Sequence, residues 1–339
     1  MVLITGGLGF IGSHTTVELI AKGFEVVIVD DLSNSTMEVL EGIEKTSGVR
    51  PIFEKIDLKD KSKVNDLFDR YDIDGVIHFA ASKAVGESVE NPLKYYENNI
   101  IPLINILHNA ERKNKKFNFI FSSSCTVYGQ AAQMPIKESA PIIKANSPYG
   151  NTKQIGEEIL EDTVTSNSIF SVVNLRYFNP VGAHPLNHIG ELPKGTPQNL
   201  VPFITQTAAG LRDQLMVFGD DYPTPDGTCI RDYIHVVDLA KAHVVALEKL
   251  YENAFDKRLE VFNVGTGKGN SVLEVIQSFE RVSGVSLNYI ITNRRPGDIT
   301  EAYADTTKVN QLLGWKAQLS LDDSMRSAWN WEKKIRGIN

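Results

Sequence analysis

A glycine-rich turn close to the amino terminus constrains the fold of this chain more than any other segment. The apolar run Val2–Ile4 leads directly into the sequence TGGLGFIG at positions 5–12, and residues 13–22 have the apolar spacing of a helix. The four glycines of this turn permit a tight reversal, let a pyrophosphate approach the backbone N–H groups, and allow the helix to pack closely on the strand. We therefore predict the first strand–turn–helix unit of a dinucleotide-binding α/β fold.

An acidic residue at the end of the next strand indicates which dinucleotide is bound. The expected strand Glu25–Val29 is followed by Asp30, about 20 residues past the glycines, where a carboxylate can hold the adenosine ribose hydroxyls. Residues 31–35 add a second acid and contain no arginine or lysine to balance a 2′-phosphate, so the sequence favours NAD over NADP. The cofactor residues predicted from these two segments are Gly6, Gly9, Phe10, Ile11, Gly12, Asp30, Asp31, Leu32, Asn34 and Ser35.

Strand and helix patterns continue to alternate through the first half of the chain. The expected strands are residues 50–56, 75–81, 117–121 and 170–175, and the expected helices are residues 60–71, 88–112 with a break near Pro102, and 149–167. Such alternation is typical of a doubly wound parallel sheet, whose ligands bind at the carboxyl ends of the strands. His78 ends one of these strands and is interpreted as a structural residue, because no partner motif surrounds it. The residues expected to face the cofactor from this edge are Asp57, Leu58, Phe79, Ala80, Lys83, Asn98 and Ser122.

A tyrosine and a lysine four residues apart form the candidate catalytic pair. Pro148 is a helix-start signal, so Tyr149 and Lys153 share one face of the first turns of the expected helix. A nearby cation favours a phenolate and brings the pKa of a tyrosine down toward the working range. Tyr149 is therefore the candidate acid–base and Lys153 its activator. Because such pairs are frequent on exposed helices, the assignment depends on the glycine turn and Asp30 that precede them.

Ser124 completes the candidate catalytic set. It lies in a run of serines at the end of the strand expected at residues 117–121. A serine at the carboxyl end of a central strand can reach a substrate hydroxyl, although serines in such loops also cap the local backbone.

Composition excludes several classes of function. A formal net charge of −7 argues against general nucleic-acid binding. The two cysteines, Cys125 and Cys229, form neither a metal pattern nor a disulfide framework, and a reducing cytoplasm fits best. His184 and His188 are separated by Pro185 and lie in a loop pattern, so we expect no metal. No uninterrupted apolar run approaches the length of a membrane span, so we expect no membrane partner.

The second half of the chain has a less regular pattern. Residues 179–195 are rich in proline, glycine and histidine and are interpreted as a substrate loop. Residues 265–269 resemble a phosphate loop but lack its Gly-Lys-Ser/Thr ending, so a simple glycine turn before a helix at Ser271 is favoured. The remaining expected elements are helices at 199–211 and 235–250, strands at 215–218 and 260–264, and short helices after residue 305 that carry Trp315, Trp329 and Trp331.

Six segments spread over almost the whole chain resemble the extended short-chain dehydrogenase/reductase family. They are TGGLGFIGSH (5–14), KAVGES (83–88), SSSCTVYG (122–129), RYFNPVGAH (176–184), PQNL (197–200) and RDYIHVVD (231–238). The resemblance implies a Rossmann-like doubly wound parallel sheet that binds NAD, together with a smaller mixed α/β substrate domain. It also implies a homodimer formed through a four-helix contact. The implied domains are residues 1–176, joined by about 235–265, for NAD, and residues 177–234 and 266–339 for a nucleotide sugar.

Within this family, the six segments are most similar to the members that epimerise C4 of UDP-hexoses. The resemblance implies a UDP-sugar partner and reversible interconversion of UDP-glucose and UDP-galactose through a 4-keto intermediate. Tyr149, Lys153 and Phe178 join the implied cofactor contacts. Arginines suit the diphosphate because a guanidinium fork matches phosphate oxygens. The implied substrate-binding residues are Lys83, Ser124, Tyr149, Asn179, Asn199, Leu200, Leu215, Val217, Phe218, Arg231, Arg295, Asp298 and Ala302.

Three other functions of the same scaffold stay open at this point. Nucleotide-sugar 4,6-dehydratases call for an Asp-Glu pair after the hydroxyl residue at the strand end, where this chain has Cys125 and Thr126. A plain NAD-dependent dehydrogenase would release reduced cofactor. A non-enzymatic protein that senses the cofactor would lack the tyrosine and the lysine.

The range of sugars accepted depends on position 302. Epimerases restricted to unacetylated sugars tend to carry a tyrosine at the matching position, whereas those that also accept N-acetylhexosamines carry a small residue. Ala302 therefore predicts that UDP-GlcNAc and UDP-GalNAc are accepted as well. Tyr303 is adjacent, so a shift of one residue in the alignment would restore the bulk.

Overall fold

The computed structural model describes residues 1–295 and 297–338 of the chain. These residues form two compact units, each assembled from segments that are distant in the sequence. The first unit comprises residues 1–129, 141–177 and 240–262, and the second comprises residues 130–140, 178–239 and 263 onward.

Residues 130–140 belong to the second unit and not to the first domain expected at residues 1–176. The backbone N–H of Ile136 donates to the carbonyl of Tyr303 at 2.9 Å, and the N–H of Asp305 donates to the carbonyl of Ile136 at 2.8 Å. These long-range pairings attach the segment to a part of the chain that lies far along the sequence. The segment has no apolar period of its own, so no local pattern marks the excursion.

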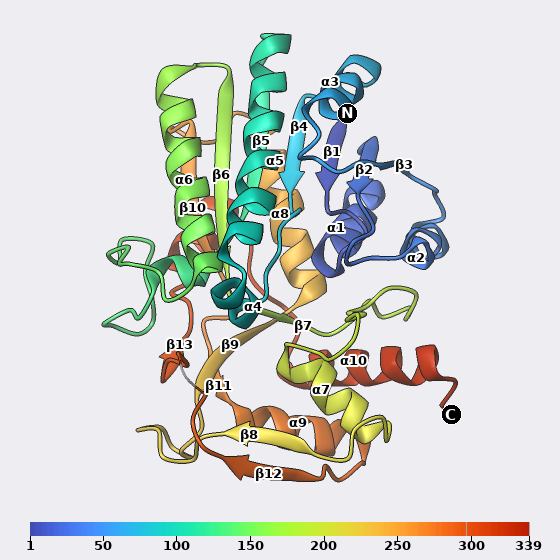
Figure 1. Ribbon diagram of the computed structural model, residues 1–339, viewed down its shortest axis with the longest axis vertical. Coiled ribbons are helices and arrows are strands. Elements are labelled where there is room, and N and C mark those ends of the chain that lie inside the picture. Colours follow the sequence, from blue (N-terminus) through green and yellow to red (C-terminus); the bar gives the residue numbers. More distant parts are fainter. Residues whose placement is uncertain (296, 339) are drawn as a thin grey trace. The chain divides into compact units, whose positions relative to one another are not determined.

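A seven-stranded sheet forms the centre of the first unit, in the order β10-β6-β5-β4-β1-β2-β3 (Figure 1). β1 pairs in parallel with β2 and β4, and β5 pairs in parallel with β4 and β6. Strands buried on both faces read as continuous apolar runs, as do VLIT in β1 and VVIVD in β2. The strand bounds are β1 Val2–Thr5, β2 Val26–Asp30, β3 Ile52–Lys55, β4 Gly75–His78, β5 Phe117–Ser124, β6 Phe170–Tyr177 and β10 Leu259–Val264.

This strand order confirms the predicted Rossmann-like doubly wound fold. The order reverses between β1 and β4, and in sheets of this kind the ligand crevice lies outside the carboxyl ends of the strands at such a reversal. Thr5, the last residue of β1, is aligned with Val29 of β2 and His78 of β4. The residues that follow these three positions are therefore brought to one edge of the sheet.

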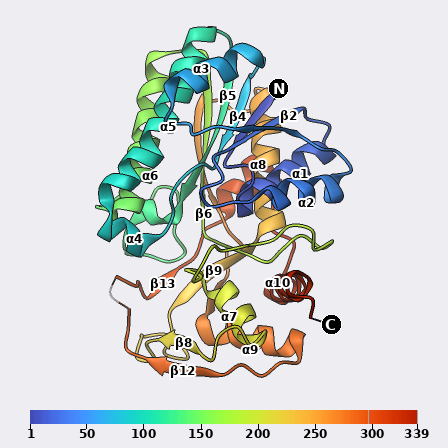
Figure 2. The same ribbon diagram turned by 45° about the vertical axis from the view of Figure 1, so that its right-hand side comes forward.

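Helices cover both faces of this sheet, with α3, α5 and α6 on one face and α1, α2 and α8 on the other (Figure 2). Apolar strand residues such as Val27, Val76 and Phe119 pack in one cluster with Phe68 of α3 and Leu103 of α5. Burial of such side chains stabilises the unit by roughly 1.5–3 kcal/mol for each one that is fully enclosed. The helix bounds are α1 Phe10–Ala21, α2 Met37–Ser47, α3 Lys61–Arg70, α4 Val85–Glu90, α5 Pro92–Lys113, α6 Pro148–Ser166 and α8 Val236–Tyr251.

The predicted break near Pro102 is wrong. The helical region is interrupted at Asn91, between α4 and α5, and Pro102 lies inside α5. Pro92 occupies the first turn of α5, where its missing N–H costs nothing because that group has no helical partner. Pro102 is buried and is accommodated within the helix.

The second unit is a smaller mixed α/β structure. Its main sheet has the order β11-β9-β13, with β7 also paired to β9, and β8 and β12 form a separate pair. Val181, Val217, Phe279 and Trp329 belong to its apolar core. The bounds are β7 Asn179–Val181, β8 Leu215–Phe218, β9 Ile230–His235, β11 Gly269–Ser271, β12 Tyr289–Thr292, β13 Glu301–Ala302, α7 Leu200–Ala208, α9 Val272–Ser283 and α10 Leu321–Arg336.

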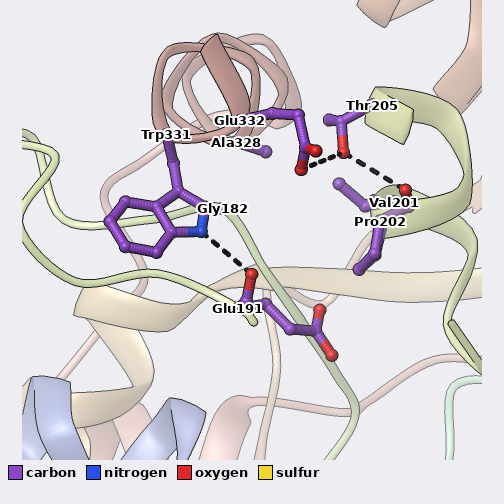
Figure 3. Close-up of a pocket in the computed structure, with 8 residues that line it drawn as sticks. All are labelled: Gly182, Glu191, Val201, Pro202, Thr205, Ala328, Trp331 and Glu332. Carbon is purple, nitrogen blue, oxygen red and sulfur yellow. Dashed lines mark hydrogen bonds between the residues drawn. The ribbon is translucent and has the colours of Figure 1, made fainter. Parts of the chain in front are cut away.

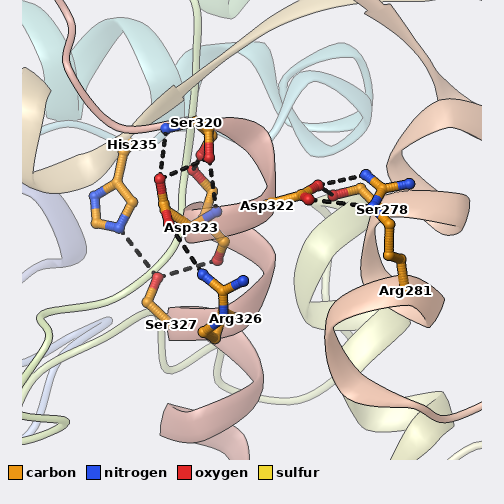
Figure 4. Close-up of polar contacts among 9 residues, drawn as sticks. His235, Ser278, Arg281, Ser320, Asp322, Asp323, Arg326 and Ser327 are labelled. Atoms are coloured by element: carbon orange, nitrogen blue, oxygen red, sulfur yellow. Dashed lines mark hydrogen bonds and ion pairs between the residues drawn. The ribbon is translucent and has the colours of Figure 1, made fainter.

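The carboxyl-terminal tail forms one long helix, α10, where the sequence predicted only short helices. Ser320 caps this helix and accepts a hydrogen bond from the backbone N–H of Asp323, in a reciprocal capping box. Asp322 binds Ser278 (2.6 Å) and Arg281 (2.5 Å), both on α9 (Figure 4). Trp329 and Trp331 lie on α10, whereas Trp315 precedes it.

The glycine turn at residues 265–269 is structural, as the sequence favoured. The carboxylate of Asp232 accepts hydrogen bonds from the backbone N–H groups of Thr266 (2.9 Å), Gly267 (3.0 Å) and Ala304 (3.2 Å). A short strand, β11, lies between the turn and α9, and Ser271 caps α9.

Candidate active site

The glycine turn between β1 and α1 has the close approaches that the sequence predicted. Gly6 has φ +64°, and a Cβ there would lie 2.9 Å from the backbone nitrogen of Ala80. A Cβ on Gly12 would lie 2.4 Å from the carbonyl oxygen of Gly6. Only glycine fits these two positions without moving main-chain atoms. Gly9 is the N-cap of α1 and brings no side-chain cap, so the first N–H groups of the helix are available to a phosphate.

Asp30 ends β2 directly beside this turn. Its Oδ2 accepts a hydrogen bond from the backbone N–H of Leu8 at 3.2 Å. Its Oδ1 accepts from the N–H of Leu32 at 3.0 Å and from the hydroxyl of Ser35 at 2.6 Å. The buried carboxylate is thus fixed by the turn on one side and by the loop of residues 31–35 on the other, and Asp31 and Asn34 lie in that same loop.

The carboxyl end of β4 is tied to the carboxyl end of β1. The backbone N–H groups of Phe79 and Ala80 donate to the carbonyl (3.1 Å) and the hydroxyl (3.2 Å) of Thr5. The same hydroxyl lies 2.8 Å from Nδ1 of His78, whose pKa burial lowers to about 3. His78 is therefore a neutral structural residue, as interpreted from the sequence. Thr5 was not singled out in the sequence, because its role arises from the alignment of strands that are far apart in the chain.

The other predicted cofactor residues occupy loops at the same edge of the sheet. Asp57 and Leu58 follow β3, and Lys83 lies in the loop before α4. Asn98, on α5, accepts a hydrogen bond from Lys59 at 3.2 Å and donates one to the hydroxyl of Ser82 at 3.1 Å. Its amide therefore fixes the loop that contains Lys83. Phe178, which was also predicted to contact the cofactor, belongs to the second unit and not to this edge of the sheet.

Tyr149, Lys153 and Ser124 come together as a buried group within the first unit. Ser147 caps α6 by accepting from the N–H of Gly150 at 3.2 Å, so the tyrosine and the lysine lie on its first two turns. Tyr149 is hydrogen-bonded to Ser124. The ammonium of Lys153 donates to the carbonyl oxygen of Ser122 at 2.6 Å and lies 6.0 Å from the centre of the Tyr149 ring.

The predicted lowering of the pKa of Tyr149 by Lys153 is wrong for the protein alone. Burial, which disfavours the phenolate, raises the pKa of Tyr149, and the nearby Tyr177 raises it further, while the hydrogen bond to Ser124 lowers it. Burial also lowers the pKa of Lys153 to about 8, against a smaller raising effect of Glu157. The spacing predicts that Tyr149 and Lys153 are neighbours, but it does not predict that both side chains are buried away from solvent.

Glu157, four residues past Lys153 on α6, was not identified from the sequence. Its position extends the four-residue spacing of Tyr149 and Lys153 by one step, and this periodicity is the signal that would have revealed it. The buried carboxylate pairs with the buried guanidinium of Arg176, the last residue but one of β6.

Within the second unit, two arginines and a carboxylate gather near β9. Asp298 lies 2.8 Å from the guanidinium of Arg295 and 3.9 Å from that of Arg231. The Arg295 guanidinium lies 5.6 Å from the centre of the Phe218 ring. Four of the predicted substrate residues are therefore neighbours, and both guanidiniums retain donors for a phosphate.

Ala302 lies beside Arg231 and faces the same side of the sheet. The two residues are register partners in the parallel pair β13–β9, and Ala302 is buried. Tyr303 faces the other side of the sheet. Its ring packs beside Gly269 and Ile230, so closely that a Cβ on Gly269 would clash with both side chains. The small residue, and not the tyrosine, therefore shares the face of Arg231.

The remaining predicted substrate residues differ in their position and in the burial of their side chains. Asn179 lies in β7, and Asn199 is the N-cap residue of α7, directly before Leu200. Leu215 and Val217 are almost completely buried in the apolar core of the second unit, so their side chains are not open to a ligand.

A small hollow close to α7 is a packing gap and not a ligand site. Its volume is about 10 Å³, and its polar lining groups are paired with one another (Figure 3). The indole N–H of Trp331 donates to the carbonyl of Glu191 at 2.9 Å, and the hydroxyl of Thr205 lies 3.3 Å from Glu332. The hollow holds at most one water molecule.

Sequence comparisons agree with this arrangement. The family model described as GDP-mannose 4,6 dehydratase, which belongs to the extended short-chain dehydrogenases/reductases, matches residues 3–328. The UDP-glucose 4-epimerase of Bacillus subtilis is 48% identical over 331 residues, which are 98% of this chain and 96% of the relative. The chain belongs to the UDP-glucose 4-epimerase family. The Drosophila melanogaster UDP-glucose 4-epimerase is 45% identical over 339 residues, covering 98% of this chain and 96% of the relative.

Solved structures of UDP-glucose 4-epimerases have the same fold. The Stenotrophomonas maltophila enzyme, with bound NAD and formylated UDP-arabinopyranose, has a TM-score of 0.94 at 46% identity and covers 100% of this chain and 99% of that one. The Bifidobacterium longum enzyme, in complex with NAD+ and UDP, also has a TM-score of 0.94, at 45% identity and the same coverage. The UDP-Glc/GlcNAc 4-epimerase of Campylobacter jejuni has a TM-score of 0.84 at 38% identity, covering 98% of this chain and 99% of that one.

Among the described residues, no helix is both long enough and apolar enough to cross a membrane.

Proposed function

We propose that the chain catalyses the reversible, NAD-dependent C4 epimerisation of UDP-hexoses, interconverting UDP-glucose and UDP-galactose. The observation that carries this proposal is the buried group of Tyr149, Lys153 and Ser124, which lies in the same unit as the glycine turn. A phenol hydrogen-bonded to a hydroxyl and backed by an ammonium suits proton transfer to and from a secondary alcohol.

The residues around the glycine turn fit NAD. Gly6 and Gly12 let main-chain atoms approach where any Cβ would clash, which keeps the turn tight, and the N-terminus of α1 suits the pyrophosphate. Asp30 would hold the adenosine ribose, and the loop of residues 31–35 offers a 2′-phosphate no cation. Bound NAD supplies a reversible hydride acceptor and a positive ring near the phenol.

The chemical roles follow from the geometry of the first unit. Tyr149 takes the proton of the sugar 4-hydroxyl and returns it when the alcohol re-forms, and Ser124 hydrogen-bonds the same oxygen. The charge of Lys153 favours the phenolate, against the burial that raises the pKa of Tyr149. Loss of hydride from C4 gives a 4-keto sugar, and return of hydride to its other face inverts the configuration without net oxidation.

The second unit would hold the nucleotide. Arg231 and Arg295 provide two guanidiniums for the diphosphate, and Asp298 keeps both in place. If the UDP moiety carries most of the binding energy, the hexose can turn over without leaving the enzyme.

Incubation of the purified protein with UDP-galactose labelled with deuterium at C4 tests this function. We expect UDP-glucose that retains the deuterium at C4, with no accumulation of NADH, because the hydride returns to the carbon from which it came. Net NADH would indicate a dehydrogenase, and a 4-keto-6-deoxy product would indicate a dehydratase. Either result would overturn the proposal.

We further propose that N-acetylated UDP-hexoses are substrates, because the small side chain of Ala302 lies on the same face of the sheet as Arg231. An Ala302→Tyr variant should lose kcat/KM for UDP-GalNAc by roughly 10–100-fold, since overfilling a buried site costs about 1–3 kcal/mol. Its kcat/KM for UDP-galactose should change much less. Parallel steady-state assays of both sugars provide the measurement.

Tyr303→Ala is the matched control for the Ala302 variant. The Tyr303 ring packs on the opposite face, against Gly269 and Ile230, so its removal should leave the ratio of the two kcat/KM values unchanged. A wild-type enzyme that forms no UDP-GlcNAc from UDP-GalNAc would disprove the broad substrate range.

A homodimer formed through α5 and α6 is also proposed. Ile101 and Ile104 of α5 are each more than one-third exposed, and Ile104 lines a shallow depression together with Ile159 of α6. Light scattering after gel filtration should give the mass of two chains for the wild type and of one chain for Ile104→Arg. Val49→Arg, at an exposed apolar position after α2, should leave the dimer intact. A wild type that has the mass of one chain at micromolar concentration would contradict the proposal.

Among the described residues, Cys125 and Cys229 form no disulfide, and a reducing cytoplasm is the location that we propose.

A further inference from the structure

A buried ion pair includes Glu157, one helical turn past Lys153 on α6 in the first unit. Glu157 is 7% exposed and Arg176 is 4% exposed. The guanidinium of Arg176 donates from Nε to both carboxylate oxygens (2.9 and 3.2 Å) and from Nη2 to Oε2 (2.5 Å). Such a bidentate contact fixes the carboxylate in both position and orientation.

Two further side chains complete the network. The hydroxyl of Ser123 donates to Oε1 of Glu157 at 2.5 Å. On the other side, Nη1 of Arg176 donates to the phenol oxygen of Tyr128 at 3.0 Å, and the guanidinium lies 4.9 Å from the centre of that ring. Every group in the network comes from β5, β6, α6 or the 3₁₀ turn Cys125–Tyr128, which are the elements that surround Lys153.

Glu157 is the carboxylate whose charge acts on the ammonium of Lys153 among the described residues. Burial lowers the pKa of His78 on β4 and raises the pKa of Tyr95 on α5, Tyr149 on α6 and Tyr177 on β6, so these groups carry no charge at neutral pH. Arg176 on β6 is a cation. The ammonium is otherwise held by the Ser122 carbonyl and by the Phe121 ring, whose centre lies 5.0 Å away.

We propose that Glu157 is a positioning residue that keeps Lys153 charged and directed at Tyr149, and that Arg176 is a second positioning residue that fixes Glu157 and moderates its effect on the lysine. In this proposal, which rests on the function proposed above, Glu157 balances the buried ammonium, and Arg176 keeps Glu157 ionised and fixed. Neither residue touches the reacting atoms. The pair acts only through the lysine.

The charges predict opposite effects for the two members of the pair. Burial already lowers the pKa of Lys153 to about 8, and Glu157 opposes that effect. With glutamine in place of Glu157, the lysine loses its counter-charge and faces an unbalanced guanidinium, so its pKa falls. With glutamine in place of Arg176, the carboxylate acts on the lysine alone, so the pKa of Lys153 rises.

Direct titration of Lys153 tests the proposal. The ¹³Cε signal of Lys153 in selectively labelled protein, assigned with a Lys153→Arg variant, gives the pKa of the ammonium. We expect Glu157→Gln to lower the pKa of Lys153 by about 1 or more and Arg176→Gln to raise it by a similar amount. The high-pH limb of the kcat profile should move in the same directions, because activity requires the charged lysine. The inference would be overturned if the pKa of Lys153 stayed unchanged in both variants or moved in the same direction in both.

Additional variants separate this effect from damage to the fold, since each single change leaves one buried charge unpaired. The double variant Glu157→Gln/Arg176→Gln leaves none, and its Lys153 pKa should lie between those of Glu157→Gln and the wild type. Glu157→Asp should restore most of the wild-type value. Arg281→Gln/Asp322→Asn removes an exposed ion pair of the second unit and should leave the pKa of Lys153 unchanged.

The two proposals fail in different ways. Opposite shifts of the Lys153 pKa in a protein without epimerase activity would retain the role of the ion pair and refute the proposed function. An active epimerase in which Lys153 has the same pKa in all variants would support the proposed function and refute the role of the ion pair.

Discussion

Replacement of Tyr149 by phenylalanine should lower kcat by a factor of roughly 10²–10⁴, the usual contribution of a positioned acid–base group. The ring stays in its buried site, and only the phenolic oxygen that bonds Ser124 is lost. The group proposed to take the proton of the 4-hydroxyl is then missing. The KM for UDP-galactose and the affinity for NAD should change little, since Arg231, Arg295 and the glycine turn are untouched. Steady-state assays together with calorimetric titration of NAD provide the measurement.

Tyr71→Phe is the matched control for the Tyr149 variant. It removes the same oxygen from a tyrosine whose hydroxyl donates to Glu54 at 2.7 Å, away from the glycine turn and α6. Its kcat should equal that of the wild type. Full activity of Tyr149→Phe would exclude Tyr149 as the acid–base group and would direct attention to Tyr177, the neighbouring buried phenol.

The second large effect is expected for Gly12→Ala. The added Cβ would meet the carbonyl oxygen of Gly6 at 2.4 Å and the Cα of Gly7 at 2.8 Å. Both are main-chain atoms, so the turn itself must open, at a cost of about 1–3 kcal/mol in the free energy of unfolding. Opening also moves the N–H groups that face the pyrophosphate. Loss of about 3 kcal/mol in such charge-assisted hydrogen bonds weakens the Kd for NAD by roughly 100-fold.

Gly86→Ala adds the same methyl group where it meets no atom within 4 Å. Gly86 lies in α4, where alanine is favoured over glycine by about 1 kcal/mol, so this variant should be as stable as the wild type or more stable. Urea unfolding and NAD titration of the two variants side by side separate a specific clash from a general effect of added volume. Wild-type NAD affinity in Gly12→Ala would show that the turn does not bind the pyrophosphate.

Most of the strands and helices of the first unit could be predicted because their information is local. Apolar runs such as VLIT and VVIVD specify buried parallel strands, and Gly6 and Gly12 specify the turn. The error near Pro102 arose because a proline was treated as a helix end. The interruption lies instead at Asn91, directly before Pro92, which begins α5.

The candidate site was less completely predictable. Spacing along one helix indicated that Tyr149 and Lys153 share a face, but the sign of the effect on Tyr149 depends on burial, which spacing does not contain. Arg176 approaches Glu157 from another strand, and residues 130–140 pair with a segment far along the chain. Contacts of this kind are set by the tertiary fold and have no local signature.

The position of Ala302 beside Arg231 has an evolutionary consequence. The backbone next to Ala302 is anchored by Asp232, which accepts a hydrogen bond from the N–H of Ala304, so a main-chain contact holds this edge of the sheet. The arginine that would grip the nucleotide lies on the adjacent strand, with its own carboxylate partner. Under the proposed role of Ala302, one amino-acid change at position 302 would widen or narrow the range of sugars accepted while the residues proposed to bind the nucleotide stay the same. Substrate range would then be a trait that such a lineage gains or loses in a single step.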